Sequence, residues 1–198
     1  MKKLPNHLGG HANVTHTDQG SINYLKNKLN IKSAYDIGCG PAGMVDLMNN
    51  SGIDCCGVDG DFTLPDHSHV LIHDFCDELP HEPNKVDLCW SVEFLEHVEE
   101  EYLDNVFEFF KSADYVFCTA STHEDEGHHH VNCKGEEYWV EVFKKYGFSL
   151  MEKETAEIRE ASTMRREFIQ ESGRLYKNEK TTQKEIPQRR VRGIRSCH

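Results

Sequence analysis

The sequence lacks the features of a membrane or secreted protein. No stretch of about 18 apolar residues occurs in its 198 residues, so no membrane-spanning helix is expected. Two lysines stand near the start, at Lys2 and Lys3, but no apolar run follows them, which argues against a signal peptide. The chain has 8 cysteines but no C-x-x-C pair, and several cysteines lie inside apolar runs. We therefore expect reduced, mostly buried thiols in a cytoplasmic protein.

Basic residues are also scarce. The chain has 22 Lys and Arg against 34 Asp and Glu, a formal net charge of −12. This balance argues against binding nucleic acid through overall charge, although it does not exclude a local basic groove. The chain contains 37 % hydrophobic and 10 % aromatic residues. At this length, such a composition is typical of one globular domain with a sizeable core. There is no internal repeat and no low-complexity block.

Short apolar runs alternate with segments of helical periodicity. The runs predict five strands, at 33–37, 54–58, 69–73, 86–92 and 115–120. Between or after them, apolar residues at helical spacing predict helices at 41–50, 98–110 and 138–146. This alternation predicts an α/β, Rossmann-like, mostly parallel sheet with helices on both faces. Such sheets bind ligands at the carboxyl ends of their strands, near the switch point in strand order.

Three regions are expected along the chain. Residues 1–32 form a lid segment and an amphipathic helix, which Ile22, Leu25 and Leu29 mark and which Asp18 can cap. Residues 33–177 form the ligand-binding domain. Residues 178–198 are polar and basic, and we expect a poorly ordered tail there.

A glycine-rich turn between the first strand and the next helix is the strongest motif. It begins after Asp36 and contains Gly38, Cys39, Gly40 and Gly43. Glycines let the backbone turn tightly and approach a ligand that a Cβ atom would exclude. The spacing also fits the G-x-G-x-x-G pattern of dinucleotide sites. Asp36 argues against that alternative, because its carboxylate would repel a pyrophosphate but could receive a cationic amino group.

Acidic residues follow the second and third strands. Asp59 and Gly60 stand at the tip of the second strand, where a carboxylate can accept hydrogen bonds from both ribose hydroxyls. Asp74 follows the third strand and could accept one from an adenine amino group, while Phe75 or Phe62 covers a ring face. The alternative is that each Asp only caps a turn and each Gly only forms one.

Over about residues 33–150, the sequence resembles class I S-adenosylmethionine-dependent methyltransferases of the type 11 kind. The resemblance rests on three motifs together: D-x-G-C-G-P-x-G, V-D-G-D, and S-V-E-F-L-E-H-V starting at Ser91. The resemblance implies a seven-stranded sheet with one antiparallel strand, whose last two strands would come from 148–157 and 165–176. It implies S-adenosyl-L-methionine as the cofactor. The cofactor-binding residues would be Asp36, Gly38, Cys39, Gly40, Gly43, Asp59, Gly60, Asp74, Phe75 and Ser91.

Three residues after the fourth strand have the spacing of a helix face. Glu93, Glu96 and His97 stand at i, i+3 and i+4, so the first turn of a helix would bring them together. Two carboxylates and an imidazole suit a hard divalent ion such as Mg²⁺, and less well Zn²⁺. The alternative is an acidic helix start, which the helix dipole favours without any metal.

A run of three histidines, His128, His129 and His130, follows the fifth strand. In an extended segment His128 and His130 would face one side. With the E-x-x-E-H motif, the run resembles two metal-assisted branches: quinone-biosynthesis O-methyltransferases and plant small-RNA terminal 2′-O-methyltransferases. The resemblance implies Mg²⁺ ligands and catalytic residues. The ligands would be Glu93, Glu96, His97 and one of the three histidines, with His129 as our choice, and His97 and the three histidines are the catalytic candidates. The motif also occurs in members without metal, so a metal-free site remains an alternative.

In this family the segment before the first strand commonly lids the substrate, so His11 and His16 are substrate candidates, with Tyr138 as a third. The first hypothesis is O-methylation of a small-molecule hydroxyl. The alternatives are an RNA 2′-O-methyltransferase, a non-catalytic S-adenosylmethionine-binding protein and a dinucleotide oxidoreductase. We expect a small-molecule substrate and no membrane partner, with RNA still open, and the sequence does not indicate an oligomeric state.

Overall fold

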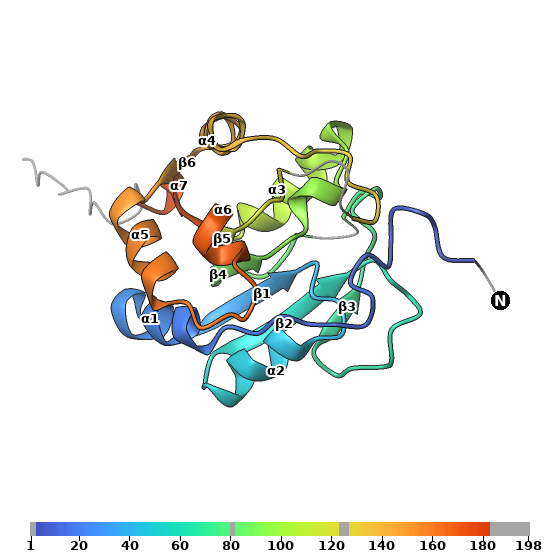
Figure 1. Ribbon diagram of the computed structural model, residues 1–198, viewed down its shortest axis with the longest axis horizontal. Coiled ribbons are helices and arrows are strands. Elements are labelled where there is room, and N and C mark those ends of the chain that lie inside the picture. The colour runs from blue at the N-terminus through green and yellow to red at the C-terminus, as the bar shows by residue number, and fades with distance from the viewer. Residues whose placement is uncertain (1–2, 80–81, 123–126, 183–198) are drawn as a thin grey trace, which may run out of the picture.

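The computed structural model describes residues 3–79, 82–122 and 127–182. A seven-stranded sheet forms its centre (Figure 1), in the order β3-β2-β1-β4-β5-β7-β6. All neighbouring strands are parallel except for β7, which runs antiparallel to both β5 and β6. The strands are β1 (Ser33–Ile37), β2 (Asp54–Asp59), β3 (Val70–Ile72), β4 (Val86–Ser91), β5 (Ala113–Cys118), β6 (Phe148–Leu150) and β7 (Arg174–Asn178). The predicted fold class is confirmed.

Helices cover both faces of this sheet (Figure 1). Helices α3 and α4 lie on one face, and α1, α2 and α5 lie on the other. The helices are α1 (Gln19–Leu29), α2 (Gly43–Asn50), α3 (Leu103–Phe110), α4 (Glu136–Lys145), α5 (Glu152–Ala161), α6 (Phe168–Ser172) and α7 (Glu179–Thr182), with 3₁₀ turns η1 (Leu95–His97) and η2 (Glu100–Tyr102). No helix in the described ranges is long and apolar enough to cross a membrane.

Successive residues of the central strands supply two separate cores, because side chains alternate between the faces of a sheet. On the α3 and α4 face, Phe143 of α4 stacks on Tyr176 of β7, with ring centroids 3.8 Å apart. On the opposite face, Trp90 and Phe117 of neighbouring strands stack at 4.7 Å. These aromatic pairs fix the sheet between its helical layers, so the strand ends that form the site are held rigidly.

The structure corrects several predicted elements. The last two strands do come from the segments 148–157 and 165–176, but each strand takes up only part of its segment. The first segment contains β6 and the start of α5, and the second contains α6 and the start of β7. In the first segment, Thr155 and Ile158 are buried on one face of an otherwise charged stretch, which is a helical pattern. The helix predicted at 98–110 begins only at Leu103, after two 3₁₀ turns.

The predicted tail begins too early. Asn178 is the last residue of β7, and its side-chain amide donates to the carbonyl of Ala113 at 2.9 Å. Residues 179–182 form α7. The remaining part of the predicted tail, 183–198, lies outside the described residues.

Candidate active site

A cavity of about 670 Å³ opens where the chain order of the sheet reverses, between β1 and β4. Its walls come from the carboxyl ends of β1, β2 and β4 and from two further segments. We call residues 4–16 the N-terminal strap and residues 127–133 the histidine loop. This volume is typical of a small-molecule site, and its place is the one that open α/β sheets use for ligands.

The glycine loop, residues 36–43, is the floor of the cavity. Gly38 has φ of +74°, and a Cβ there would lie 2.5 Å from the ring of Phe94. Gly40 has φ of +49°, and its amide donates to a carboxylate oxygen of Asp59 at 2.8 Å. The other oxygen of Asp59 accepts from the amide of Asp61, also at 2.8 Å. Asp59 therefore holds two loops in place besides facing the cavity.

Asp36 lies at the end of β1 and is 4 % exposed. Its burial and the nearby Asp59 raise its pKa to about 8. A cationic group in the cavity would favour the ionised form of Asp36, since opposite charges lower a carboxyl pKa. Cys39 also lines the cavity, whereas the buried Ser91 does not and its hydroxyl has no hydrogen-bond partner among the described residues.

The segment after β3 forms one wall. Asp74 and Phe75 line the cavity there, and Phe75 is 5 % exposed. Gly60 lines the same wall, where a Cβ would lie 2.5 Å from the side chain of Leu8. Phe62, the other aromatic named as a ring cover, is 39 % exposed and lines a separate surface hollow. Of the two aromatics, Phe75 is the one placed to cover a ring in the cavity.

The N-terminal strap crosses the cavity through polar contacts to each neighbouring wall. His7 bonds Asp74 at 2.9 Å and His11 bonds Asp61 at 3.1 Å. The amide of Gly43 donates to the hydroxyl of Thr15 at 3.2 Å. His11, a predicted substrate contact, lines the cavity. His16 also lines it, with its ring edge against Phe168 at 5.3 Å. Sequence reasoning missed His7, because only the fold brings residues 7 and 74 together.

Glu93 and Glu96 meet beside the cavity, although no α-helix joins them. Glu93 has φ of +53° and is fixed by Thr119, whose hydroxyl accepts from the Glu93 amide and donates to its carboxylate at 2.8 Å. Glu96, in η1, is fully buried, and neither of its carboxylate oxygens has a hydrogen-bond partner among the described residues. Burial and the neighbouring Glu93 raise the pKa of Glu96 well above its ordinary value.

Backbone hydrogen bonds dock the histidine loop onto η1. The amides of Val131 and Asn132 both donate to the carbonyl of Glu96 at 3.0 Å. His97 Nδ1 lies 2.7 Å from the carbonyl of His128, and a carbonyl only accepts, so Nδ1 carries the proton and Nε2 does not. Burial and the neighbouring His130 lower the pKa of His97 to about 4, which keeps its imidazole neutral.

The sequence suggested an extended run of three histidines. The structure instead places a turn at His129, the middle residue of the run. His129 has φ of +54° and points to Glu99, with its Nε2 2.9 Å from the carboxylate. His128 and His130 line the cavity and His129 does not. The ligand atoms of Glu96, His97 and His130 lie within 4.8 Å of one another, so His130 occupies the place that we had assigned to His129.

Tyr138 was named as a substrate contact. It lies on α4, packs edge-on against Trp139 at 5.1 Å and is not among the residues that line the cavity. Other groups do line it that were not named as site candidates: Glu99, Tyr102, Glu171 and Ser172. They come from the segment around η2 and from α6, where no local motif marks them.

Comparison with known proteins relates the central part of the chain to methyltransferases. Residues 35–118, from β1 to the end of β5, match the family model of a methyltransferase domain. This match supports an S-adenosylmethionine-dependent methyltransferase. No curated protein matches it.

Solved structures share the fold of this chain. A TehB-like SAM-dependent methyltransferase from Corynebacterium glutamicum is 15 % identical, with a TM-score of 0.58, 80 % of this chain and 87 % of that chain covered. The methyltransferase domain of bacterial CtHen1-C is 16 % identical, with a TM-score of 0.53 and coverages of 79 % and 93 %. Magnesium protoporphyrin IX methyltransferase from Synechocystis, solved with bound SAM, is 15 % identical, with a TM-score of 0.50 and coverages of 78 % and 74 %.

Proposed function

We propose that the methyltransferase transfers the methyl group to a hydroxyl oxygen of a small organic molecule, with the help of a divalent cation. The observation that carries this proposal is the meeting of two carboxylates, of the fully buried Glu96 and its neighbour Glu93, with the neutral imidazole of His97. Buried carboxylates normally pair with a cation or a donor. The site fits a divalent cation in its chemistry.

The residues divide between two ends of the cavity. At the cofactor end, Asp36 would receive the cationic amino group, Asp59 the ribose hydroxyls and Asp74 the adenine amino group. At the acceptor end, Glu93, Glu96, His97 and His130 would hold the cation. A cation bound there would lower the pKa of a coordinated hydroxyl and favour its ionised, nucleophilic form. His97 keeps Nε2 unprotonated, so this atom can bind a cation or accept the hydroxyl proton.

The charges around the cavity favour a small acceptor over RNA. Among the described residues that line the cavity, Arg174 is the only one with a basic Lys or Arg side chain. Its guanidinium is already paired with the carboxylate of Glu136 at 3.4 Å. Phosphate backbones are normally bound by several basic side chains. The cavity volume of about 670 Å³ must also hold both the cofactor and the acceptor, so the acceptor is small.

The test screens catechols, quinols and sugars for methylation by the purified enzyme with labelled S-adenosylmethionine. We expect turnover on a catechol-like diol that falls by about tenfold or more after chelation with EDTA and returns with Mg²⁺. Glu96→Gln and His97→Ala should lower turnover by about 100-fold and change S-adenosylhomocysteine affinity by less than about twofold. Glu100→Gln, at an exposed glutamate of η2, is the matched control and should behave as the wild type.

Different experimental results would overturn different parts of the proposed function. Full turnover after chelation overturns the role of the cation. Methylation of nitrogen or carbon in place of oxygen overturns the acceptor class. Failure of S-adenosylhomocysteine to bind by calorimetry overturns the assignment of the cavity to the cofactor.

A further inference from the structure

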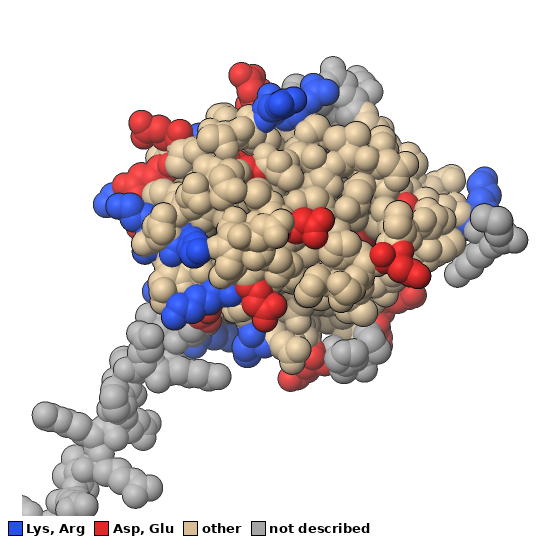
Figure 2. All heavy atoms as spheres, turned by 90° about the horizontal axis from the view of Figure 1, so that it is seen from below, with Lys and Arg blue, Asp and Glu red and all other residues tan. Residues whose placement is uncertain are grey.

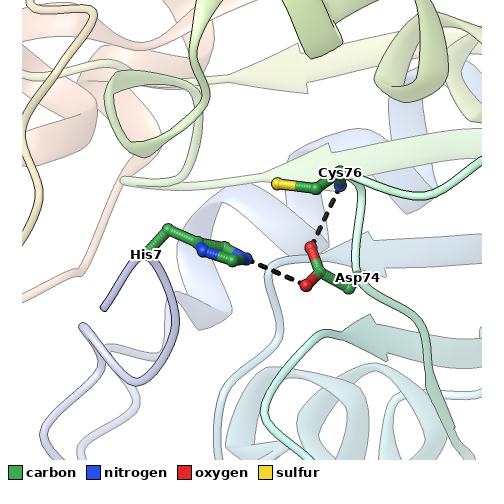
Figure 3. A group of neighbouring side chains, drawn as sticks. All are labelled: His7, Asp74 and Cys76. Atoms are coloured by element: carbon green, nitrogen blue, oxygen red, sulfur yellow. Dashed lines mark hydrogen bonds and ion pairs between the residues drawn. The ribbon is translucent and has the colours of Figure 1, made fainter. Parts of the chain in front are cut away.

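A second group of metal-ligating side chains lines the cavity, separate from the cluster of Glu96. Figure 3 shows His7 from the N-terminal strap, and Asp74 and Cys76 from the segment after β3, with their polar atoms turned toward one another. The imidazole nitrogen, a carboxylate oxygen and the thiol sulfur lie within 4.8 Å of one another. The three residues are half-buried and all line the cavity.

The geometry of the group is already organised by Asp74. One carboxylate oxygen bonds His7 at 2.9 Å, and the other accepts from the amide of Cys76 at 3.0 Å. This second bond turns the chain so that the Cys76 side chain stands beside the His7 ring (Figure 3). Ligand atoms on one zinc ion lie on the order of 3.5 Å apart, so modest side-chain rotations suffice to bring these three to a common ion.

We propose that His7, Asp74 and Cys76 form a binding site for a transition-metal cation, with Zn²⁺ as the best match. The donor set of one nitrogen, one oxygen and one sulfur is typical of zinc, whereas Mg²⁺ and Ca²⁺ take oxygen ligands. Three protein ligands leave one position of a tetrahedral ion for water. The site is chemically different from the cluster of Glu96, His97 and His130, which contains no thiol.

The bound ion fastens the strap across the cavity. His7 is the only ligand from the strap, and the other two belong to the wall that carries the predicted adenine partner. Asp74 can serve both functions, since a carboxylate has two oxygens and about four acceptor positions. His129 stands nearby, with its ring centroid 6.1 Å from that of His7, and is held by Glu99.

Cobalt provides the probe, because Co²⁺ occupies zinc sites and a thiolate ligand adds a sulfur-to-cobalt charge-transfer band in the near ultraviolet. The full-length protein is stripped with a chelator and titrated with Co²⁺. We expect this band in the wild type and in His97→Ala, which disrupts the other cluster. We expect no band in Cys76→Ser and at least a tenfold weaker affinity in His7→Ala. Cys56→Ser is the matched control, since Cys56 is a half-buried thiol on β2 outside the cavity, and it should keep the band.

A second measurement needs no variant. Zn²⁺ should slow the alkylation of Cys76 by iodoacetamide by about tenfold or more, as measured by mass spectrometry of the Cys76 peptide, and should leave the alkylation of Cys133 unchanged. A wild-type protein without the charge-transfer band at saturating Co²⁺, a band that persists in Cys76→Ser, or unprotected Cys76 would each overturn the proposal. None of these results depends on methyl transfer, so the site can fail while the proposed function stands.

Discussion

Asp36 places a buried ionisable group at the wall of the cavity, and its titration should therefore affect folding stability. Its pKa is raised to about 8 in the folded, ligand-free protein, because of burial and of Asp59. A raised carboxyl pKa contributes stability at low pH that is lost as the pH rises from the unfolded value of about 3.9 to about 8. We expect Asp36→Asn, which imitates the protonated form, to unfold at a higher temperature than the wild type at pH 8.

The difference in melting temperature should be at least about 3 °C at pH 8 and should shrink toward pH 5. In a domain of this size, each kcal/mol of unfolding free energy shifts the melting temperature by about 2–4 °C. The same variant should bind S-adenosylhomocysteine at least about tenfold more weakly at pH 8, because it has no charge to offer an amino group. Thermal scans at both pH values and calorimetry provide the data. A melting difference that does not change with pH would contradict the shifted pKa.

Asp59 combines two roles, and a pair of variants can separate them. Its oxygens accept from the amides of Gly40 and Asp61, so they fix the loops, and we propose that they also bind the ribose hydroxyls. We expect Asp59→Ala to weaken S-adenosylhomocysteine binding by more than about tenfold, as for the loss of a charge-assisted hydrogen bond. Asp59→Asn keeps one acceptor oxygen, so its affinity for S-adenosylhomocysteine should fall less than that of Asp59→Ala. Unchanged binding in Asp59→Ala, measured by calorimetry, would remove the ribose role.

At the residue scale the sequence placed residues at strand ends better than residues in loops. Asp36, Asp59 and Asp74 stand at strand ends, so strand periodicity alone placed them at one edge of the sheet. His129 and His130 could not be distinguished in this way, because the choice depends on a left-handed turn at His129. His7 had no local signal, since its partner is 67 residues away.

Among the elements, α1 is fixed mainly by its cap. Asp18 is fully buried, accepts from the amide and hydroxyl of Ser21, and also from the hydroxyl of Ser162 and the amide of Thr163 after α5. Burial alone would raise its pKa, but these hydrogen bonds outweigh it and the pKa is lowered. Its contribution to stability is therefore present at neutral pH and lost as the pH falls through the lowered value.

We expect Asp18→Ala to destabilise the protein by about 2–3 kcal/mol, because it removes a helix cap and leaves buried donors without a partner. The loss should be largest at neutral pH and smaller in acid. Chemical denaturation at pH 7 and pH 4 measures it. Asp54→Ala, at an exposed aspartate, is the control and should change stability by less than about 0.5 kcal/mol. Equal losses in the two variants would contradict the cap.

The N-terminal strap depends on a close approach to the glycine loop. A Cβ on Gly40 would lie 2.9 Å from the Cβ of His11, and Gly40 has a positive φ that other residues rarely adopt. We expect Gly40→Ala to displace the strap and weaken S-adenosylhomocysteine binding by about tenfold. Limited proteolysis should cut residues 4–16 faster. Gly135→Ala, where a Cβ meets no atom within 4 Å, is the control. Unchanged proteolysis in Gly40→Ala would mean that the strap does not depend on this contact.

The elements that the sequence predicted best were those with a clear period. The bounds of β1 were predicted in full, and α4 nearly so, because both have a continuous apolar pattern. The last two strands were located only within longer segments, since β6 has three residues and lies at the sheet edge. Short edge strands carry little periodicity, and tertiary pairing decides them.

For the whole molecule, charge decides which acceptors can approach. The net charge is −12, and on the face in Figure 2 the Lys and Arg side chains lie mainly along one side, with acidic side chains scattered over the rest. This face therefore offers no continuous basic surface in its coloured part. A polyanion would approach a predominantly acidic protein against an unfavourable field.

We therefore expect no measurable binding of a 20-nucleotide single-stranded RNA at about 0.15 M salt, as measured by fluorescence anisotropy. Turnover of a neutral diol should be nearly independent of salt, because no phosphate contact contributes to its binding. The control is a chain that ends at residue 182 and lacks the basic segment 183–198, so that any weak binding through that segment is recognised. RNA binding that persists in the shortened chain and weakens steeply with salt would overturn the small-molecule assignment in favour of an RNA hydroxyl as the acceptor.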